Sequence, residues 1–144
     1  ADARALNPRK IMTRVNLSVG ILCGSQSELQ INTEVSGKED CGIEETFINA
    51  KIIAYSEKAW TAGEGCLSIP DLYEEVTRPW SVTIRYQDNE FKEQNRTYYG
   101  YTARIIQHEF EHTQGKLYID RLSPLRKQLI KNKLMRIIKG NRKK

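Results

Sequence analysis

The sequence predicts an α+β fold in which antiparallel strands surround one central helix, followed by a basic amphipathic helix at the C-terminus. Three observations carry this prediction. Short segments in the middle of the chain are rich in β-branched and aromatic residues. A helical pattern then spans residues 101–114, and a second one follows a Ser-Pro pair. With 144 residues, of which 39% are hydrophobic, we expect a single domain over residues 1–144 with its own core.

The expected strands alternate with turn chemistry. Residues 46–55 (TFINAKIIAY) combine β-branched and aromatic side chains. The next segment, AGEGCLSIPD, has two glycines and a proline around a cysteine, which favours a loop or a bulged strand. Residues 80–88 alternate strictly, and RTYYGY then starts a return strand. The alternation places three apolar side chains on one face of this strand, namely Val82, Ile84 and Tyr86.

Two helices are expected after these strands. The first runs from about Tyr101 to about Gln114, and Gly115 is a natural stop. The second begins with Ser123 as its cap and Pro124 in its first turn. Its lysines are expected to face solvent, and its apolar positions to form one packing stripe: Leu125, Leu129, Leu134 and Ile137 or Ile138.

The composition indicates a cytoplasmic protein without a membrane partner. No apolar run approaches the roughly 18–20 residues of a membrane helix. The first residues, ADARALNPRK, lack the apolar centre of a secretory signal and do not begin with Met, which is typical of a processed chain or a piece of a longer one. Three cysteines, an odd number, fit a reducing compartment better than a disulfide framework.

The net charge of +5 is concentrated at the C-terminal end. Residues 121–144 contain ten lysines and arginines and no acidic residue. Such a segment can contact phosphate backbones or acidic lipid, or it can be a solvated helix face.

Both histidines of the chain lie in the segment QHEFEHTQGKL. His108 and His112 are four residues apart, so a helix places both imidazoles on one face. Glu109 follows the first histidine, close enough to reach a water beside the metal. This is the HExxH arrangement of metal hydrolases, and the alternative is two ordinary histidines on a partly exposed helix.

Two histidines need a third ligand, and Cys66 is the candidate. Gly65 precedes it and lets another backbone approach closely. One thiolate and two imidazoles leave one coordination position open, which is typical of catalytic sites. Taken alone, Cys66 would be a buried small hydrophobe. Cys23 and Cys41 have no such context and are expected to be structural free thiols.

The segments EGCLSIP and QHEFEHTQGKLYIDRLSP resemble the second and third motifs of the peptide deformylase family, from about Phe47 to the C-terminus. The resemblance implies a metal held by Cys66, His108 and His112, with Glu109 as general base. It also implies hydrolysis of the formyl group from N-formylmethionine at the N-terminus of nascent polypeptides, releasing formate.

The resemblance assigns further roles around this centre. The oxyanion would be held by the backbone N–H of Leu67 and the side chain of Gln26, from the first motif. Gly65 would offer its backbone to the peptide, and Ile105 would line the methionine pocket. Tyr101 lies on the same helix face and is a further candidate for the pocket.

The chain departs from the family pattern at two places. In VGILCGSQ, the gapless register makes Gln26 the oxyanion glutamine and places Val19 and Ile21 where glycines are expected; matching Gly20 instead needs one inserted residue. The altered motif could narrow the cleft or lower activity. Glu111 replaces an aspartate and either orients a neighbour of the metal site or is solvated.

The resemblance also suggests the ion and the partners. It implies ferrous iron, whereas the Cys and His ligands alone suit zinc; nickel and cobalt are further candidates. The basic C-terminal helix is a candidate contact with the ribosome. Arg78 is expected to pair with Glu64 near the site, or to form an exposed ion pair of small energetic value. Two alternative functions stay open: a non-catalytic deformylase-like protein that binds peptide or ribosome, and another small metallopeptidase.

Overall fold

The structure, a computed structural model, describes residues 28–33, 40, 42–66 and 68–141. These described residues form six strands, two α-helices and one 3-10 helix. In chain order they are β1 (Glu28–Thr33), β2 (Ile43–Tyr55), β3 (Ala59–Cys66), β4 (Ile69–Pro79), β5 (Ser81–Gln87), β6 (Glu93–Tyr99), α1 (Gly100–Thr113), η3 (Tyr118–Arg121) and α2 (Pro124–Asn141).

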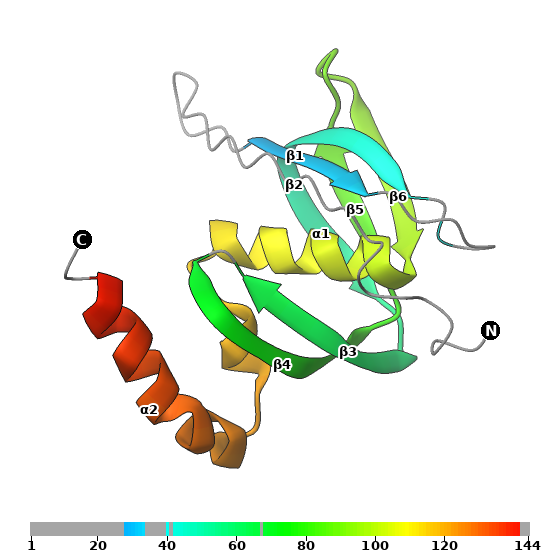
Figure 1. Cartoon of the computed structure of the whole chain (residues 1–144). Helices are drawn as coiled ribbons and strands as arrows, with labels where there is room; N and C mark the ends of the chain where they lie inside the picture. Colours follow the sequence, from blue (N-terminus) through cyan, green and yellow to red (C-terminus); the bar gives the residue numbers. More distant parts are fainter. Residues whose placement is uncertain (1–27, 34–39, 41, 67, 142–144) are drawn as a thin grey trace.

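The strands form two antiparallel sheets with α1 between them (Figure 1). The four-stranded sheet has the order β1-β2-β5-β6, and the second sheet is the β3-β4 pair. The α+β prediction, with antiparallel strands around one central helix, is confirmed. Within the described residues, no helix combines the length and the apolar character needed to cross a membrane.

The four-stranded sheet packs its apolar face on α1. Val82, Ile84 and Tyr86 are all buried, as the alternation of β5 predicts. The ring of Phe47 contacts the Tyr86 ring edge-on, with centroids 4.5 Å apart. Ile106 of α1 joins the same core. This face of α1 is therefore apolar, and its opposite face is free to carry polar groups toward β3-β4.

A distant aspartate caps α1. The carboxylate of Asp40 accepts hydrogen bonds from the backbone N–H of Thr102, at 3.1 Å, and from its hydroxyl, at 2.5 Å. Gly100 has φ +62°, and a Cβ there would lie 2.9 Å from an Asp40 oxygen. The start of the helix therefore depends on both residues.

The segment AGEGCLSIPD holds the end of β3 and the start of β4, and its irregularity lies within the pairing of these two strands. β3 pairs with β4 in regular register up to Gly65 and Tyr73, and the register shifts before Cys66 pairs with Ile69. This irregularity lies directly at the cysteine.

The second helix begins where the sequence predicts. The Ser123 hydroxyl accepts the backbone N–H of Arg126, at 3.2 Å, and Pro124 is the first helical residue. The predicted stripe is partly wrong. Leu125 and Leu129 are exposed, at 68% and 63%, and so is Ile138.

The buried face of α2 is instead formed by Ile130, with Leu134 and Ile137 partly buried beside it. They pack against a core made by β4, η3 and the residue after it: Ile69, Leu72, Val76, Tyr118 and Leu122. The position of β4 and η3, rather than the number of leucines, therefore selects the packed face.

Candidate metal centre

The three predicted metal ligands lie together. Cys66 ends β3, and His108 and His112 project from neighbouring turns of α1. Their ligand atoms all lie within 4.8 Å of one another. The Cys66 Sγ is 3.5 Å from the His112 Nε2. One soft sulfur and two imidazole nitrogens converge on one point, and this donor set fits a divalent transition metal.

Glu64 orients the first of these histidines. The Nδ1–H of His108 donates to Glu64 Oε1, at 3.1 Å. This bond leaves the other ring nitrogen, Nε2, as the acceptor that a metal requires. Tyr118 stacks on the His108 ring, with centroids 5.9 Å apart and planes at 20°. The ring is therefore held by a carboxylate at one edge and an aromatic surface on one side.

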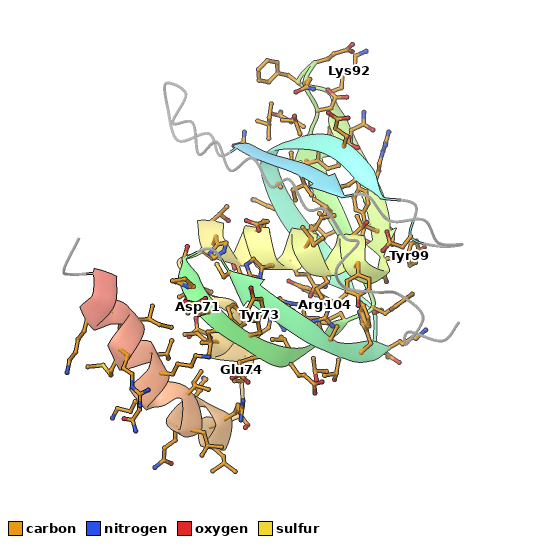
Figure 2. All side chains as sticks on the ribbon, in the orientation of Figure 1. Asp71, Tyr73, Glu74, Lys92, Tyr99 and Arg104 are labelled. Atoms are coloured by element: carbon orange, nitrogen blue, oxygen red, sulfur yellow. The ribbon has the colours of Figure 1, made fainter. Side chains whose placement is uncertain are left out.

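Two buried arginines neutralise Glu64. Arg78 donates to both of its oxygens, at 2.6 and 2.9 Å, and Arg104 donates to one, at 2.6 Å. Figure 2 shows Arg104 between α1 and the β3-β4 pair. The predicted Arg78–Glu64 pair is present, but the exposed alternative is wrong, since Arg78 is fully buried. Burial alone would raise the pKa of Glu64; hydrogen bonds from His108 and Arg78 and the nearby positive charges lower it to about 2.

The protein environment shifts the pKa values of Glu109, His112 and His108 in different directions. Burial raises the pKa of Glu109, and the nearby His108 opposes the rise only in part. Burial lowers the pKa of His112, and the positive charge of His108 adds to this. Burial also disfavours charge on His108, but its hydrogen bond to Glu64 raises the pKa overall. A buried carboxyl with a raised pKa is suited to accept and return a proton.

Glu111 is not solvated. It is buried on the α1 face toward β4. Its Oε1 accepts from Nε of Arg121, at 2.6 Å, and its Oε2 lies 3.2 Å from Nη1 of Arg78. The sequence left two possibilities for Glu111, which replaces the family's aspartate: a role beside the metal site, or a solvated side chain. The structure supports the first.

The residues predicted around the centre lie at different places. Ile105 is half-buried and packs against the core below the four-stranded sheet. The Tyr101 ring contacts the Trp60 ring edge-on, with centroids 4.8 Å apart. Gly65 is exposed, and a Cβ there would lie 2.7 Å from the ring of Tyr73. Their roles in peptide binding stay predictions.

Some predicted residues lie outside the described part of the chain. These are Gln26, Leu67, the altered first motif, Cys23 and Cys41. Conversely, the importance of Arg104, Arg121 and Tyr118 was missed. Arg104 lies one helical turn before His108, so its spacing was the available signal. For Arg121 and Tyr118, only their place in YIDRL, after the histidines, offered a hint.

A family model described as polypeptide deformylase matches residues 12–128. The chain belongs to the peptide deformylase family. A peptide deformylase of Flavobacterium psychrophilum is 44% identical over 99 residues, covering 69% of this chain and 51% of the relative. One from Christiangramia forsetii is 46% identical over 98 residues, covering 68% and 50%.

Solved peptide deformylases have the same architecture. Peptide deformylase 1B of Arabidopsis thaliana, in complex with an inhibitor, has a TM-score of 0.66 and 36% identity, covering 71% of this chain and 56% of that one. The Ehrlichia chaffeensis enzyme in complex with actinonin has a TM-score of 0.65 and 30% identity, covering 76% and 64%. The chain spans about half the length of the curated relatives it matches. The family implies a divalent metal, and the Cys66, His108 and His112 cluster provides ligands for one.

Proposed function

We propose that this chain hydrolyses the formyl group from N-formylmethionine at the N-terminus of nascent polypeptides, releasing formate. The observation that carries the proposal is the convergence of Cys66, His108 and His112, with Glu109 buried next to His108 in the chain. Residues 1–144 would act as one catalytic domain. Formylated peptides are the substrate class that the family name indicates.

Three residues would bind the metal, and a fourth transfers the proton. Cys66, His108 and His112 would hold the divalent ion, which when bound polarises the formyl carbonyl and makes water easier to deprotonate. Glu109 takes the proton from the attacking water and delivers it to the leaving amine. Burial raises the pKa of Glu109, and a carboxylate with a raised pKa takes a proton from water more readily than an ordinary carboxylate does.

The remaining groups would bind and orient the peptide. Gln26 and the backbone N–H of Leu67 would donate to the oxyanion. Gly65, which is exposed near the end of β3, would offer its backbone to the peptide. Ile105 and Tyr101, on the α1 face one turn before the histidines, would line the methionine pocket.

We propose ferrous iron as the native ion, by resemblance to the family. The donor set of one cysteine and two histidines also suits zinc, nickel and cobalt. Metal analysis of protein purified without oxygen distinguishes these ions.

We also propose that the protein acts in the cytoplasm, where nascent chains emerge, and that α2 contacts the ribosome. Exposed basic side chains follow the length of α2, namely Lys127, Lys131, Lys133, Arg136 and Lys139. Such a contact would be mainly electrostatic, so binding to ribosomes should weaken as the salt concentration rises.

The test is release of formate from formyl-Met-Ala-Ser by protein loaded anaerobically with ferrous iron. We expect formate and a free Met-Ala-Ser, and no cleavage of unformylated Met-Ala-Ser. Cleavage of the unformylated peptide would indicate a peptidase instead. One bound metal per chain without any formate would indicate a non-catalytic peptide-binding or ribosome-binding relative.

A further inference from the structure

A row of alternating charges leads from the surface to a metal ligand. It begins at Arg121 in η3, passes through Glu111, Arg78 and Glu64, and ends at the Nδ1–H of His108. We call these five residues the ionic chain. Successive members lie 2.5 to 3.2 Å apart. Three elements besides α1, namely η3, β4 and β3, contribute to it.

We propose that Arg121 is a positioning residue for the metal centre, acting through Glu111, Arg78 and Glu64 on the orientation of His108. The inference rests on the proposed metal site and adds a distant residue that controls its affinity.

The inner end of the ionic chain fixes the carboxylate that orients His108. The Oε1 of Glu64 accepts from both Arg78 Nη2, at 2.9 Å, and His108 Nδ1, at 3.1 Å. Its Oε2 accepts from Arg78 Nε, at 2.6 Å. A two-point contact of this kind sets the plane of the carboxylate. Arg104 Nη1 also donates to Glu64 Oε2, at 2.6 Å, so a rotation of Arg78 removes two of the three arginine contacts that hold this carboxylate and changes the direction in which His108 is held.

The contact between Arg78 and Glu111, in the middle of the ionic chain, has the poorest hydrogen-bond geometry of its four contacts. The Arg78 Nη1 and the Glu111 Oε2 lie 3.2 Å apart, but neither atom has a hydrogen bond of good geometry within the described residues. The contact is an ion pair without alignment. Glu111 is nevertheless buried, and a buried carboxylate is costly unless opposite charge compensates it.

Arg121 supplies this compensation from outside. Its Nε and Nη2 both contact Glu111 Oε1, at 2.6 and 2.5 Å. Without Arg121, the charge of Glu111 would be compensated mainly by Arg78. The Arg78 guanidinium would then be drawn toward Glu111 and away from its two-point contact with Glu64. The loss would reach His108 although Arg121 contacts no metal ligand in the described interactions.

The test is the affinity for Zn²⁺ alone, measured by competition with a chelator. We expect Arg121→Gln to weaken zinc binding about tenfold, the lower end of the range for loss of a ligand's direct hydrogen-bond partner, because Arg121 acts through three intermediate residues. Arg121→Lys keeps the charge and should restore part of the affinity. The absorption spectrum of Co²⁺ bound to the same variants should shift with Arg121→Gln, since it reports the arrangement of thiolate and imidazole ligands.

Arg126→Gln is the matched control. Arg126 also joins a later helix to a buried carboxylate of β4, with contacts of 2.6 and 2.9 Å to Glu74 (Figure 2 labels Glu74). Glu74 lies opposite Glu64 in the strand pairing, but within the described residues its side-chain hydrogen bonds go to Arg126 and to neither Glu64 nor a metal ligand. We expect this variant to lose thermal stability and to keep zinc affinity within about twofold, a change worth about 0.4 kcal/mol. An equal loss of zinc affinity in Arg121→Gln and Arg126→Gln would mean that both act by destabilising the fold in general, and it would overturn the proposal.

Adding Arg121→Gln to a Glu111→Gln protein tests whether Arg121 acts through Glu111 or through the position of η3. Arg121 shares η3 with Tyr118, which stacks on His108. If Arg121 acts through Glu111, then Arg121→Gln should have little further effect on zinc affinity once Glu111 is neutral. An undiminished effect would assign the influence to η3 itself and contradict the proposal. Failure of the unmodified protein to bind zinc would refute the metal centre, whereas normal binding by Arg121→Gln would refute only the positioning role.

Discussion

At the scale of single residues, Glu64 is the best compensated charge in the structure. It receives hydrogen bonds from Arg78, Arg104 and His108 while it is 8% exposed. Arg104 also donates to the backbone oxygens of Val76 and Trp60, so it connects α1 to both strands of the second sheet. A change in the charge of Glu64 therefore affects the metal ligand and the packing of α1 on this sheet together.

We predict a loss of stability in acid that originates at Glu64. Its pKa is 4.5 in a model peptide and about 2 in the folded chain, so its contribution is complete above pH 4.5 and disappears as the pH falls toward 2. The contribution is at most about 3 kcal/mol. The measurement is the free energy of urea unfolding of the metal-free protein between pH 6 and pH 2.

Two variants test the assignment of this acid transition. Glu64→Gln should be less stable at neutral pH and should lose most of the dependence between pH 4.5 and 2. Glu93→Gln removes an exposed carboxylate that pairs with the exposed Arg85, and it should behave as the unmodified protein. An unchanged acid transition in a folded Glu64→Gln protein would refute the assignment.

At the scale of elements, the packed face of α2 can be tested by comparing a buried residue with its exposed neighbour. Ile130 is 5% exposed in the second core, whereas Leu129 is 63% exposed on the neighbouring position. We expect Ile130→Ala to lower the free energy of unfolding by about 2–4 kcal/mol, because it leaves a cavity. Leu129→Ala should change it by less than about 0.5 kcal/mol. Chemical unfolding of the two variants gives both values, and a larger loss for Leu129→Ala would contradict the packing described.

The cap of α1 gives a second prediction at this scale. Asp40→Ala removes the acceptor for the N–H and the hydroxyl of Thr102 and should cost about 1–2 kcal/mol. Asp40→Asn keeps one side-chain oxygen and should cost less. The midpoint of thermal unfolding ranks the variants, and equal stability of Asp40→Ala and the unmodified protein would show that the cap contributes nothing.

At the scale of the whole molecule, local patterns predicted the elements and the ligands. The alternation of Val82, Ile84 and Tyr86 identifies β5, and the spacing of His108 and His112 places both on one helix face. Cys66 follows from ligand chemistry, since two histidines need a third donor.

The features that sequence reasoning missed depend on contacts between distant segments. Asp40 lies 62 residues from the helix residue that it caps, and Glu64 lies 44 residues from His108. The buried face of α2 depends on where β4 and η3 lie, so its own pattern of leucines was misleading. Arg121 shows the same limit: its basic character is visible in the sequence, but its partner is a buried glutamate of α1.

The central claim is that Cys66, His108 and His112 bind a catalytic metal and that Glu109 moves the proton. The most direct test measures metal content and formate release on the same anaerobic preparation of Glu109→Ala. We predict one bound ion per chain, as in the unmodified protein, with formate release from formyl-Met-Ala-Ser reduced at least about 100-fold. Cys66→Ala should lose the ion itself. Full activity of Glu109→Ala with the metal retained would contradict the account.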